Sequence, residues 1–191
     1  AGFAPLYPQR RLDDPALAAA RAAVEQLLAA HEPYPALAVD RHWTLLAANR
    51  AVQRLLVGVD ATLLEPPVNV LRLSLHPAGL APRILNLAEW RAHLFARLRQ
   101  QIDASADAAL DQLLRELRAY PAAAGTAAEP AQASVVVPLV LATPLGTLRF
   151  FSTTTVFGTP VEVTLSELAI ESFFPADGET AELLRRLGEL S

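Results

Sequence analysis

Apolar positions recur at helical spacing in the first part of the chain. They predict a helix over 14–31, in which Asp14 supplies an N-cap, Pro15 suits the first helical position and Pro33 follows the end. The apolar face of this helix carries Leu17, Ala20, Val24, Leu27 and Leu28. Residues 1–12 show no period, and we interpret them as a linker or arm.

Two short apolar runs follow and predict strands over 36–40 and 43–48. Asn49 is placed to cap a helix over 50–56. This order of two short strands and an asparagine-capped helix is similar to the start of PAS-type sensor domains. Residues 59–85 contain several prolines and predict only short helical pieces.

Helical spacing returns in two longer segments. The first is predicted over 86–102, with Asn86 and Glu89 forming a capping box, and Ser105 opens the second, which ends at Tyr120. The first of these helices presents an apolar face and a basic face. The apolar face carries Leu87, Trp90, Leu94, Leu98 and Ile102, and the basic face carries Arg91, Arg97 and Arg99.

The densest strand signal lies between Thr143 and Asp177, where valine, threonine and phenylalanine are frequent, and an almost wholly apolar run over 134–142 precedes it. Together they predict three antiparallel strands, over 134–142 (covered on both faces), over 148–157 and from 161 onward, with turns at 143–146 and 158–160. The apolar phase then slips, which predicts a bulge near Ser166-Glu167. Asp177 is expected to cap a last helix, and 122–133 to form a flexible loop.

This order of elements predicts an α+β fold over residues 13–191. We expect a PAS-like, five-stranded antiparallel sheet with helices packed on one face, plus N- and C-terminal helices. The formal net charge of -4 argues against nucleic-acid binding by this piece alone. No apolar run approaches the roughly 20 residues that span a bilayer, and the absence of cysteine is compatible with a cytoplasmic location. Because the chain has no methionine, even at position 1, we expect it to be part of a longer protein.

The sequence carries no catalytic signature. Its four histidines, His31, His42, His76 and His93, lack metal-ligand spacing, and without cysteine a zinc site is not expected. Neither a G-x-S-x-G elbow nor a glycine-rich phosphate loop occurs. We therefore predict no catalytic residue, no metal and no cofactor, and hence no enzyme.

Several motifs occur together in one order: Asn69-Val70-Leu71-Arg72, Leu75-His76-Pro77, the Trp90-to-Arg99 helix opened by Asn86, and the strand motifs TPLGTLRFFST, FGTPVEVT and ELAIESFFPAD. In this combination, roughly residues 30–190 resemble the MmyB-like ligand-binding domains of bacterial helix-turn-helix (XRE-type) transcription regulators. The resemblance implies a PAS-like fold, a DNA-binding domain that is absent from this sequence, and a fatty-acid-like ligand in an apolar cavity. Dimerisation is expected by analogy, because such regulators read paired DNA half-sites.

With this resemblance, we predict a cavity between the sheet and the helices of residues 70–100, lined by Trp90, Leu94, Phe150 and Phe173. The residues by themselves equally allow solid core packing. A carboxylate head group in the cavity would need a hydrogen-bond donor. The candidates are Arg72, His76 and Arg149, with Ser152 offering a hydroxyl. Arg149 is expected on the opposite face of its strand, and the alternative for Arg72 is an ion pair with an internal acid.

The leading hypothesis is a non-enzymatic, cytoplasmic sensor domain of a bacterial transcription regulator. It would bind a fatty-acid-like molecule, form a homodimer, have no membrane partner and reach DNA only through the missing N-terminal domain. The alternative hypothesis is a ligand-free module for dimerisation or for protein interaction.

Overall fold

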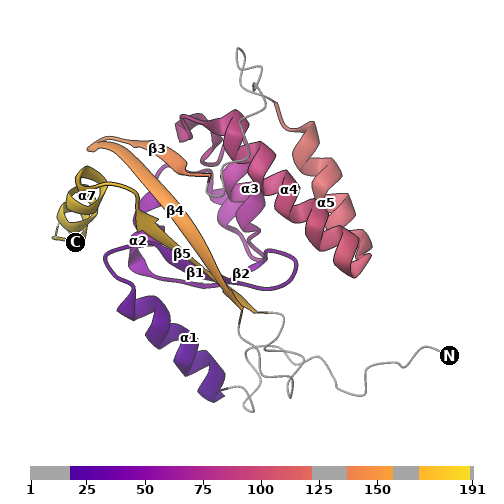
Figure 1. Cartoon of the computed structure of the whole chain (residues 1–191), viewed down its shortest axis with the longest axis horizontal. Helices are drawn as coiled ribbons and strands as arrows, with labels where there is room; N and C mark the ends of the chain where they lie inside the picture. Colours follow the sequence, from indigo (N-terminus) through magenta and orange to yellow (C-terminus); the bar gives the residue numbers. More distant parts are fainter. Residues whose placement is uncertain (1–17, 122–136, 157–167, 190–191) are drawn as a thin grey trace.

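A five-stranded antiparallel sheet forms the centre of the computed structural model (Figure 1). The structure describes residues 18–121, 137–156 and 168–189. The strand order is β2-β1-β5-β4-β3, so the early strand β1 pairs with the late strand β5. The strands are β1 (Ala36–Val39), β2 (Leu45–Ala48), β3 (Leu139–Thr143), β4 (Gly146–Val156) and β5 (Ala169–Pro175).

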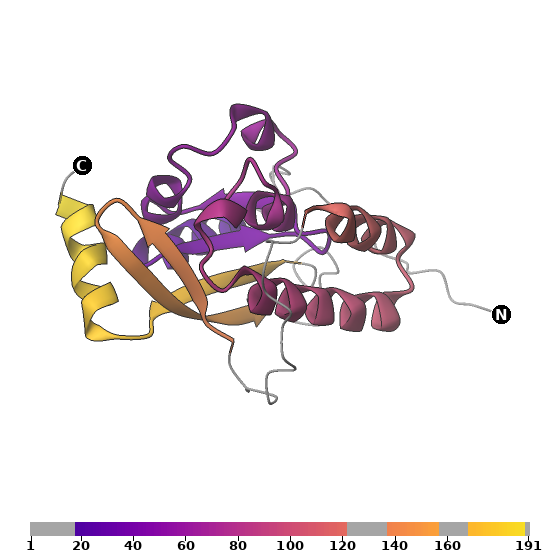
Figure 2. The ribbon, with the colours of Figure 1, turned by 90° about the horizontal axis from the view of Figure 1, so that it is seen from above.

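Helices lie on both faces and at one end of the sheet. Helices α3 and α4 cover one face, here called the inner face, and α5 packs against both of them. Helix α1 lies on the opposite, outer face, and Figure 2 shows α7 beside the β3–β4 hairpin. The helices are α1 (Ala18–Ala30), α2 (Arg50–Leu55), α3 (Val70–Leu75), α4 (Leu87–Ser105), α5 (Ala108–Ala119) and α7 (Gly178–Glu189), with 3₁₀ helices η2 (Ala61–Leu64) and η3 (Ala81–Arg83).

Strand β1 separates two hydrophobic clusters. Leu37 and Val39 belong to the large cluster on the inner face, whereas Ala36 and Ala38 pack with α1 on the outer face. Successive side chains of a strand point to opposite faces, so a strand covered on both sides needs apolar residues throughout. This burial explains why β1 reads as a continuous apolar run.

Strand β3 differs from its prediction. We expected the run 134–142 to be covered on both faces, but β3 is an edge strand of the sheet. Leu141 is buried, while its neighbours Val140 and Ala142 are only partly buried. The segment before α4 lies along this edge, where the N–H of Leu85 donates to the carbonyl of Val140 at 2.8 Å. The edge is therefore closed by backbone contacts rather than by a further strand.

The predicted helix starts are partly right. Asn49 caps α2, and Asp177 accepts a hydrogen bond from the first turn of α7, as expected. The predicted capping box at Asn86 is wrong, because its side chain bonds strand β3 and the side chain of Glu89 instead of the start of α4. Helix α4 continues through Ser105, and Asp107 is the residue that caps α5.

The sheet, its order and the surrounding helices confirm an α+β, PAS-like fold. Some predictions fall outside the described residues: the arm 1–12, the cap at Asp14, the loop 122–133, the turn 158–160 and the bulge near Ser166-Glu167. The β4–β5 pair is the longest in the sheet, and its seven paired positions run from Phe150↔Pro175 to Val156↔Ala169.

Candidate functional site

An apolar cavity of about 100 Å³ lies between the inner face of the sheet and the helices α2, α3 and α4. This is the place predicted from the sequence. The sheet forms its floor, and apolar residues of the helices cover it from the other side. The sheet contributes Leu37, Leu45, Leu139, Leu141, Phe150 and Phe173. The helical residues include Val52, Leu55, Leu71, Leu73, Trp90 and Leu94.

Four of the predicted site residues lie in this lining: Trp90, Leu94, Phe150 and Phe173. Phe150 and Phe173 meet edge to face, with ring centroids 6.1 Å apart. The indole N–H of Trp90 donates to the hydroxyl of Ser74 at 2.9 Å, so the polar atom of the tryptophan is satisfied and its ring is held in place. Ser152, Arg72 and His76 are not among the lining residues.

Arg72 forms the ion pair that was the alternative interpretation of this residue. Its guanidinium donates two hydrogen bonds to Glu116, at 2.8 and 2.7 Å, and the hydroxyl of Tyr120 donates to the same carboxylate. The bond from Arg72 lowers the pKa of Glu116, and burial together with the neighbouring carboxylate raises the pKa of Tyr120 to about 12. His76 packs edge-on against Tyr120, with 5.0 Å between the ring centroids.

This ion pair predicts a small acid-dependent part of the stability. Because the folded pKa of Glu116 is lowered, the pair stabilises the fold above the ordinary pKa of 4.5, and the contribution is lost as the pH falls through the folded pKa. Both side chains are more than a third exposed, so we expect Glu116→Gln to lower the unfolding free energy near neutral pH by only about 0.5 kcal/mol. Urea unfolding at a series of pH values should show the variant and the wild type converging in acid; a constant difference would contradict the assignment.

The polar end of the cavity is formed by Arg97 and Glu171. The guanidinium donates to both carboxylate oxygens, at 2.5 and 3.3 Å, and the hydroxyl of Thr154 donates to the carboxylate at 2.7 Å. The Glu171 side chain is 5% exposed and that of Arg97 is 25% exposed. The guanidinium also lies over the ring of Trp43, 4.8 Å from its centroid, which adds a cation–π contact.

The sequence reasoning missed Arg97 and placed it on the basic face of its helix. The signal was present: Arg97 follows Trp90 by seven residues and Leu94 by three, and both spacings keep a side chain on one face of a helix. Glu171 likewise lies two residues before Phe173 and points to the same side of β5. A charged residue whose spacing puts it on the apolar face of a helix or strand is therefore a candidate for the polar part of a cavity lining.

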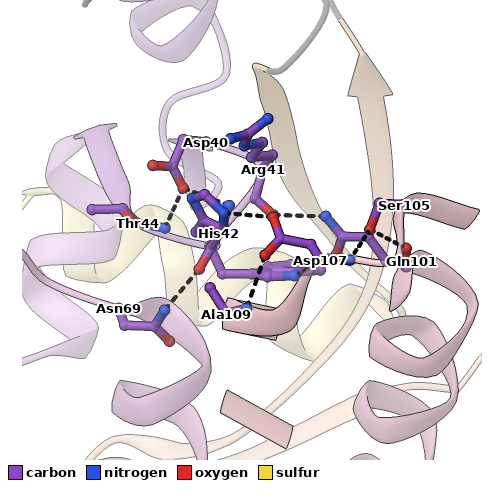
Figure 3. Close-up of polar contacts among 10 residues, drawn as sticks. Asp40, Arg41, His42, Thr44, Asn69, Gln101, Ser105, Asp107 and Ala109 are labelled. Atoms are coloured by element: carbon purple, nitrogen blue, oxygen red, sulfur yellow. Dashed lines mark hydrogen bonds and ion pairs between the residues drawn. The ribbon is translucent and has the colours of Figure 1, made fainter. Parts of the chain in front are cut away.

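Trp43 of the lining was also missed. Figure 3 shows the hydrogen bonds of the turn around it, among Asp40, His42 and Thr44. The φ of Trp43 is 66° and lies in the left-handed region, which a bulky residue adopts rarely. The carboxylate of Asp40 supports this turn by accepting from the N–H groups of His42 and Thr44, both at 2.8 Å. The indole N–H of Trp43 donates to Gln101 of α4 at 2.9 Å.

The same turn is tied to the start of α5. His42 hydrogen-bonds Asp107 at 2.9 Å, and this contact, followed by the N–H of Ala109, lowers the pKa of the Asp107 carboxyl. Gln101 donates to the carbonyl of Arg41 at 2.6 Å, and Asn69 donates to the carbonyl of His42 at 2.9 Å. The wall that contains Trp43 is thus fixed to α3, α4 and α5.

Seventeen of the twenty residues that line the cavity are apolar, and the polar ones are Ser74, Arg97 and Glu171. Within the described ranges 18–121, 137–156 and 168–189, no three histidine or acidic side chains are grouped so that they could hold a metal ion. Among the helices in these ranges, none combines the length and the apolar character needed to cross a membrane.

Comparison with known proteins identifies a family for this chain. The model of the MmyB-like transcription regulator ligand binding domain matches residues 20–187, which is most of the chain and includes every residue of the cavity. No curated protein matches the chain.

Proposed function

The chain belongs to the family of MmyB-like transcription regulator ligand-binding domains, and on this premise we propose that the cavity between α4 and the sheet binds an amphipathic molecule with a fatty-acid-like chain. The observation that carries the proposal is the cavity itself. Its lining is apolar except for Ser74, whose hydroxyl is bound by Trp90, and for the end where Arg97 and Glu171 lie. Burial of a methylene group stabilises by about 0.8 kcal/mol, so an acyl chain would bind such a lining without many polar contacts.

The size of the cavity bears on the mechanism. Sites for drug-sized ligands usually have volumes of roughly 300–1,000 Å³. The cavity of about 100 Å³ is smaller, so a full acyl chain must enlarge it. The sheet is held by strand pairing, whereas α2 and α3 have six residues each and are joined by a segment that contains the short 3₁₀ helix η2. Ligand binding therefore favours an arrangement in which these helices move outward over the sheet.

Occupancy reaches the rest of the regulator by population shift: the ligand stabilises the enlarged arrangement by its differential affinity for it. Asn49 caps α2 and donates to the carbonyl of Leu28 near the end of α1. An outward movement of α2 would thus change the position of α1. In this proposal the domain acts in the cytoplasm as a homodimer and affects DNA binding through a separate helix-turn-helix domain.

The test uses Phe150, whose ring lines the cavity and is 1% exposed. Phe150→Trp puts a larger ring where the ligand would lie, so we expect a folded variant whose affinity for a C12 fatty chain falls at least about ten-fold, or about 1.4 kcal/mol. Isothermal titration calorimetry measures this, and native mass spectrometry of the untreated domain should show a bound mass that organic extraction removes.

Phe151→Trp is the matched control. Phe151 is the next residue of β4, points to the outer face and stacks on Phe174 with 5.3 Å between the ring centroids. It should leave the affinity unchanged. If the wild type binds no fatty chain and carries no extractable mass, the proposal is wrong, and the ligand-free interaction module becomes the better explanation.

A further inference from the structure

The charges at the polar end of the cavity compensate each other. Among the described lining residues, Arg97 and Glu171 are the two that carry a formal charge. The guanidinium of Arg97 donates to both carboxylate oxygens of Glu171. Its Nη2 atom, which makes one of these bonds, also donates to the hydroxyl of Thr154 at 2.9 Å. A ligand head group entering this end meets an ion pair that is already complete.

A carboxylate would be disfavoured at this end. It would have to share one guanidinium with the carboxylate of Glu171, which is almost fully buried, and two like charges close together in a site with little water repel each other. A hydroxyl, ester or amide can donate to or accept from the same groups without adding charge. The electrostatic balance therefore distinguishes head groups even when the chains are identical.

Among the described residues that line the cavity, Arg97 is the single cation, and the other candidates for a carboxylate partner lie elsewhere or are engaged. Arg72 is bound to Glu116, and Arg149 lies on the outer side of β4 with its guanidinium 3.7 Å from Asp177. His93 stacks on Trp90, but burial and the charge of Arg97 hold the pKa of this histidine below its ordinary value, so it is neutral near pH 7. Arg97 is the cation that a head group would meet.

We propose that this ion pair makes the cavity selective for fatty-chain ligands with an uncharged head group, such as alcohols, esters or amides, over carboxylates of the same chain length. The inference rests on the proposed function, since it concerns the head group of the ligand that the cavity binds. Its specificity-determining residue is Glu171, which neutralises Arg97.

The experiment compares 1-decanol with decanoate at about pH 7.5, where the free acid is ionised. Both tryptophans of the chain, Trp43 and Trp90, line the cavity, so their intrinsic fluorescence reports binding without a label. For the full wild-type chain we expect the alcohol to bind at least about ten-fold more tightly than the carboxylate.

Glu171→Gln keeps the size and one acceptor of the side chain but removes its charge, which leaves the guanidinium of Arg97 uncompensated. The preference for the alcohol should then disappear or reverse. Glu116→Gln is the matched control, because it also removes the acidic partner of an arginine, at a pair outside the cavity lining, and it should keep the wild-type preference.

The outcomes separate the two proposals. If decanoate binds the wild type as tightly as the alcohol, or more tightly, the neutral-head inference is wrong and the ligand-binding function stands. If neither molecule binds the wild type, the function itself fails. A wild-type preference that Glu171→Gln leaves unchanged, in a variant with wild-type circular dichroism, would overturn the role of Glu171. The wild-type comparison tests the selectivity even if the variant does not fold.

Discussion

Replacing Arg97 with methionine is expected to lower the free energy of unfolding by about 3 kcal/mol, at the lower end of the range for breaking one side of a buried ion pair. The cause is the partner that stays behind. The side chain of Glu171 is 5% exposed, and without Arg97 the hydroxyl of Thr154 would be the one donor left to its carboxylate among the described residues. An unpaired charge in such a place costs more than the apolar contacts of methionine return.

The double variant Arg97→Met, Glu171→Leu separates the burial of a lone charge from the loss of packing. Both charges are then replaced by apolar side chains of similar size, and such replacements are often neutral or stabilising. We expect the double variant to lie within about 1 kcal/mol of the wild type in urea unfolding monitored by circular dichroism. If the double variant is as unstable as Arg97→Met, the ion pair is not the cause, and the contact of Arg97 with Trp43 becomes the explanation.

This expectation also explains why an ion pair is found in an apolar cavity. If uncharged residues would stabilise the fold equally well, stability is not the reason for Arg97 and Glu171. A role in recognising the head group of a ligand provides one, and the two experiments on this pair are complementary. The unfolding free energy of the double variant shows how much the ion pair contributes to stability. The ligand preference of Glu171→Gln shows whether the pair selects the head group.

Local signals in the sequence predicted those parts of the fold that neighbouring residues determine. Helical spacing placed Trp90 and Leu94 on the apolar face of α4, whereas the cavity between this helix and the sheet, which Phe150 and Phe173 also line, was expected from the family resemblance rather than from a local period. The cap at Asn49 was predictable because a capping side chain bonds the backbone only a few residues ahead.

Contacts between distant residues were not predictable in the same way. Arg72 and Glu116 are 44 residues apart, and His42 and Asp107 are 65 apart, so no local pattern links them. Asn86 illustrates the competition between the two kinds of contact. Its position favoured a capping box, but the edge of β3 supplies a carbonyl and an N–H that bond the same side chain at 2.7 and 3.1 Å.

Asn49→Ala is expected to lower the free energy of unfolding by about 3 kcal/mol, more than the roughly 1 kcal/mol of an ordinary helix cap. The side chain is 6% exposed and makes four hydrogen bonds. Its oxygen accepts from the N–H groups of Ala36 and Val52, and its amide nitrogen donates to the carbonyls of Leu28 and Tyr34. With alanine at this position, these backbone N–H and carbonyl groups, several of them buried, would lose the hydrogen bonds that Asn49 makes with them.

Asn49→Ser tests how the lost free energy of unfolding divides between the cap of α2 and the hydrogen bonds to α1 and β1. Serine can still cap α2 through Val52, but its side chain is shorter, so the bonds to α1 and β1 are lost. We expect it to recover about 1 kcal/mol of the loss in chemical denaturation. A full recovery would show that Asn49 is only a helix cap. Asp60→Ala, which removes the cap of the exposed helix η2, is the matched control and should change stability much less than Asn49→Ala.

The same variant tests how the cavity communicates with the outer face. Asn49 joins the end of α1, the start of β1 and the start of α2, and α2 contributes Val52 and Leu55 to the cavity lining. In amide hydrogen exchange, ligand binding to the wild type should therefore change protection in α1 as well as around the cavity. In Asn49→Ser the change around the cavity should remain while the change in α1 becomes smaller, because the side chain that links the two helices is shortened. An unchanged response of α1 would show that the coupling passes through β1 and its alanines instead.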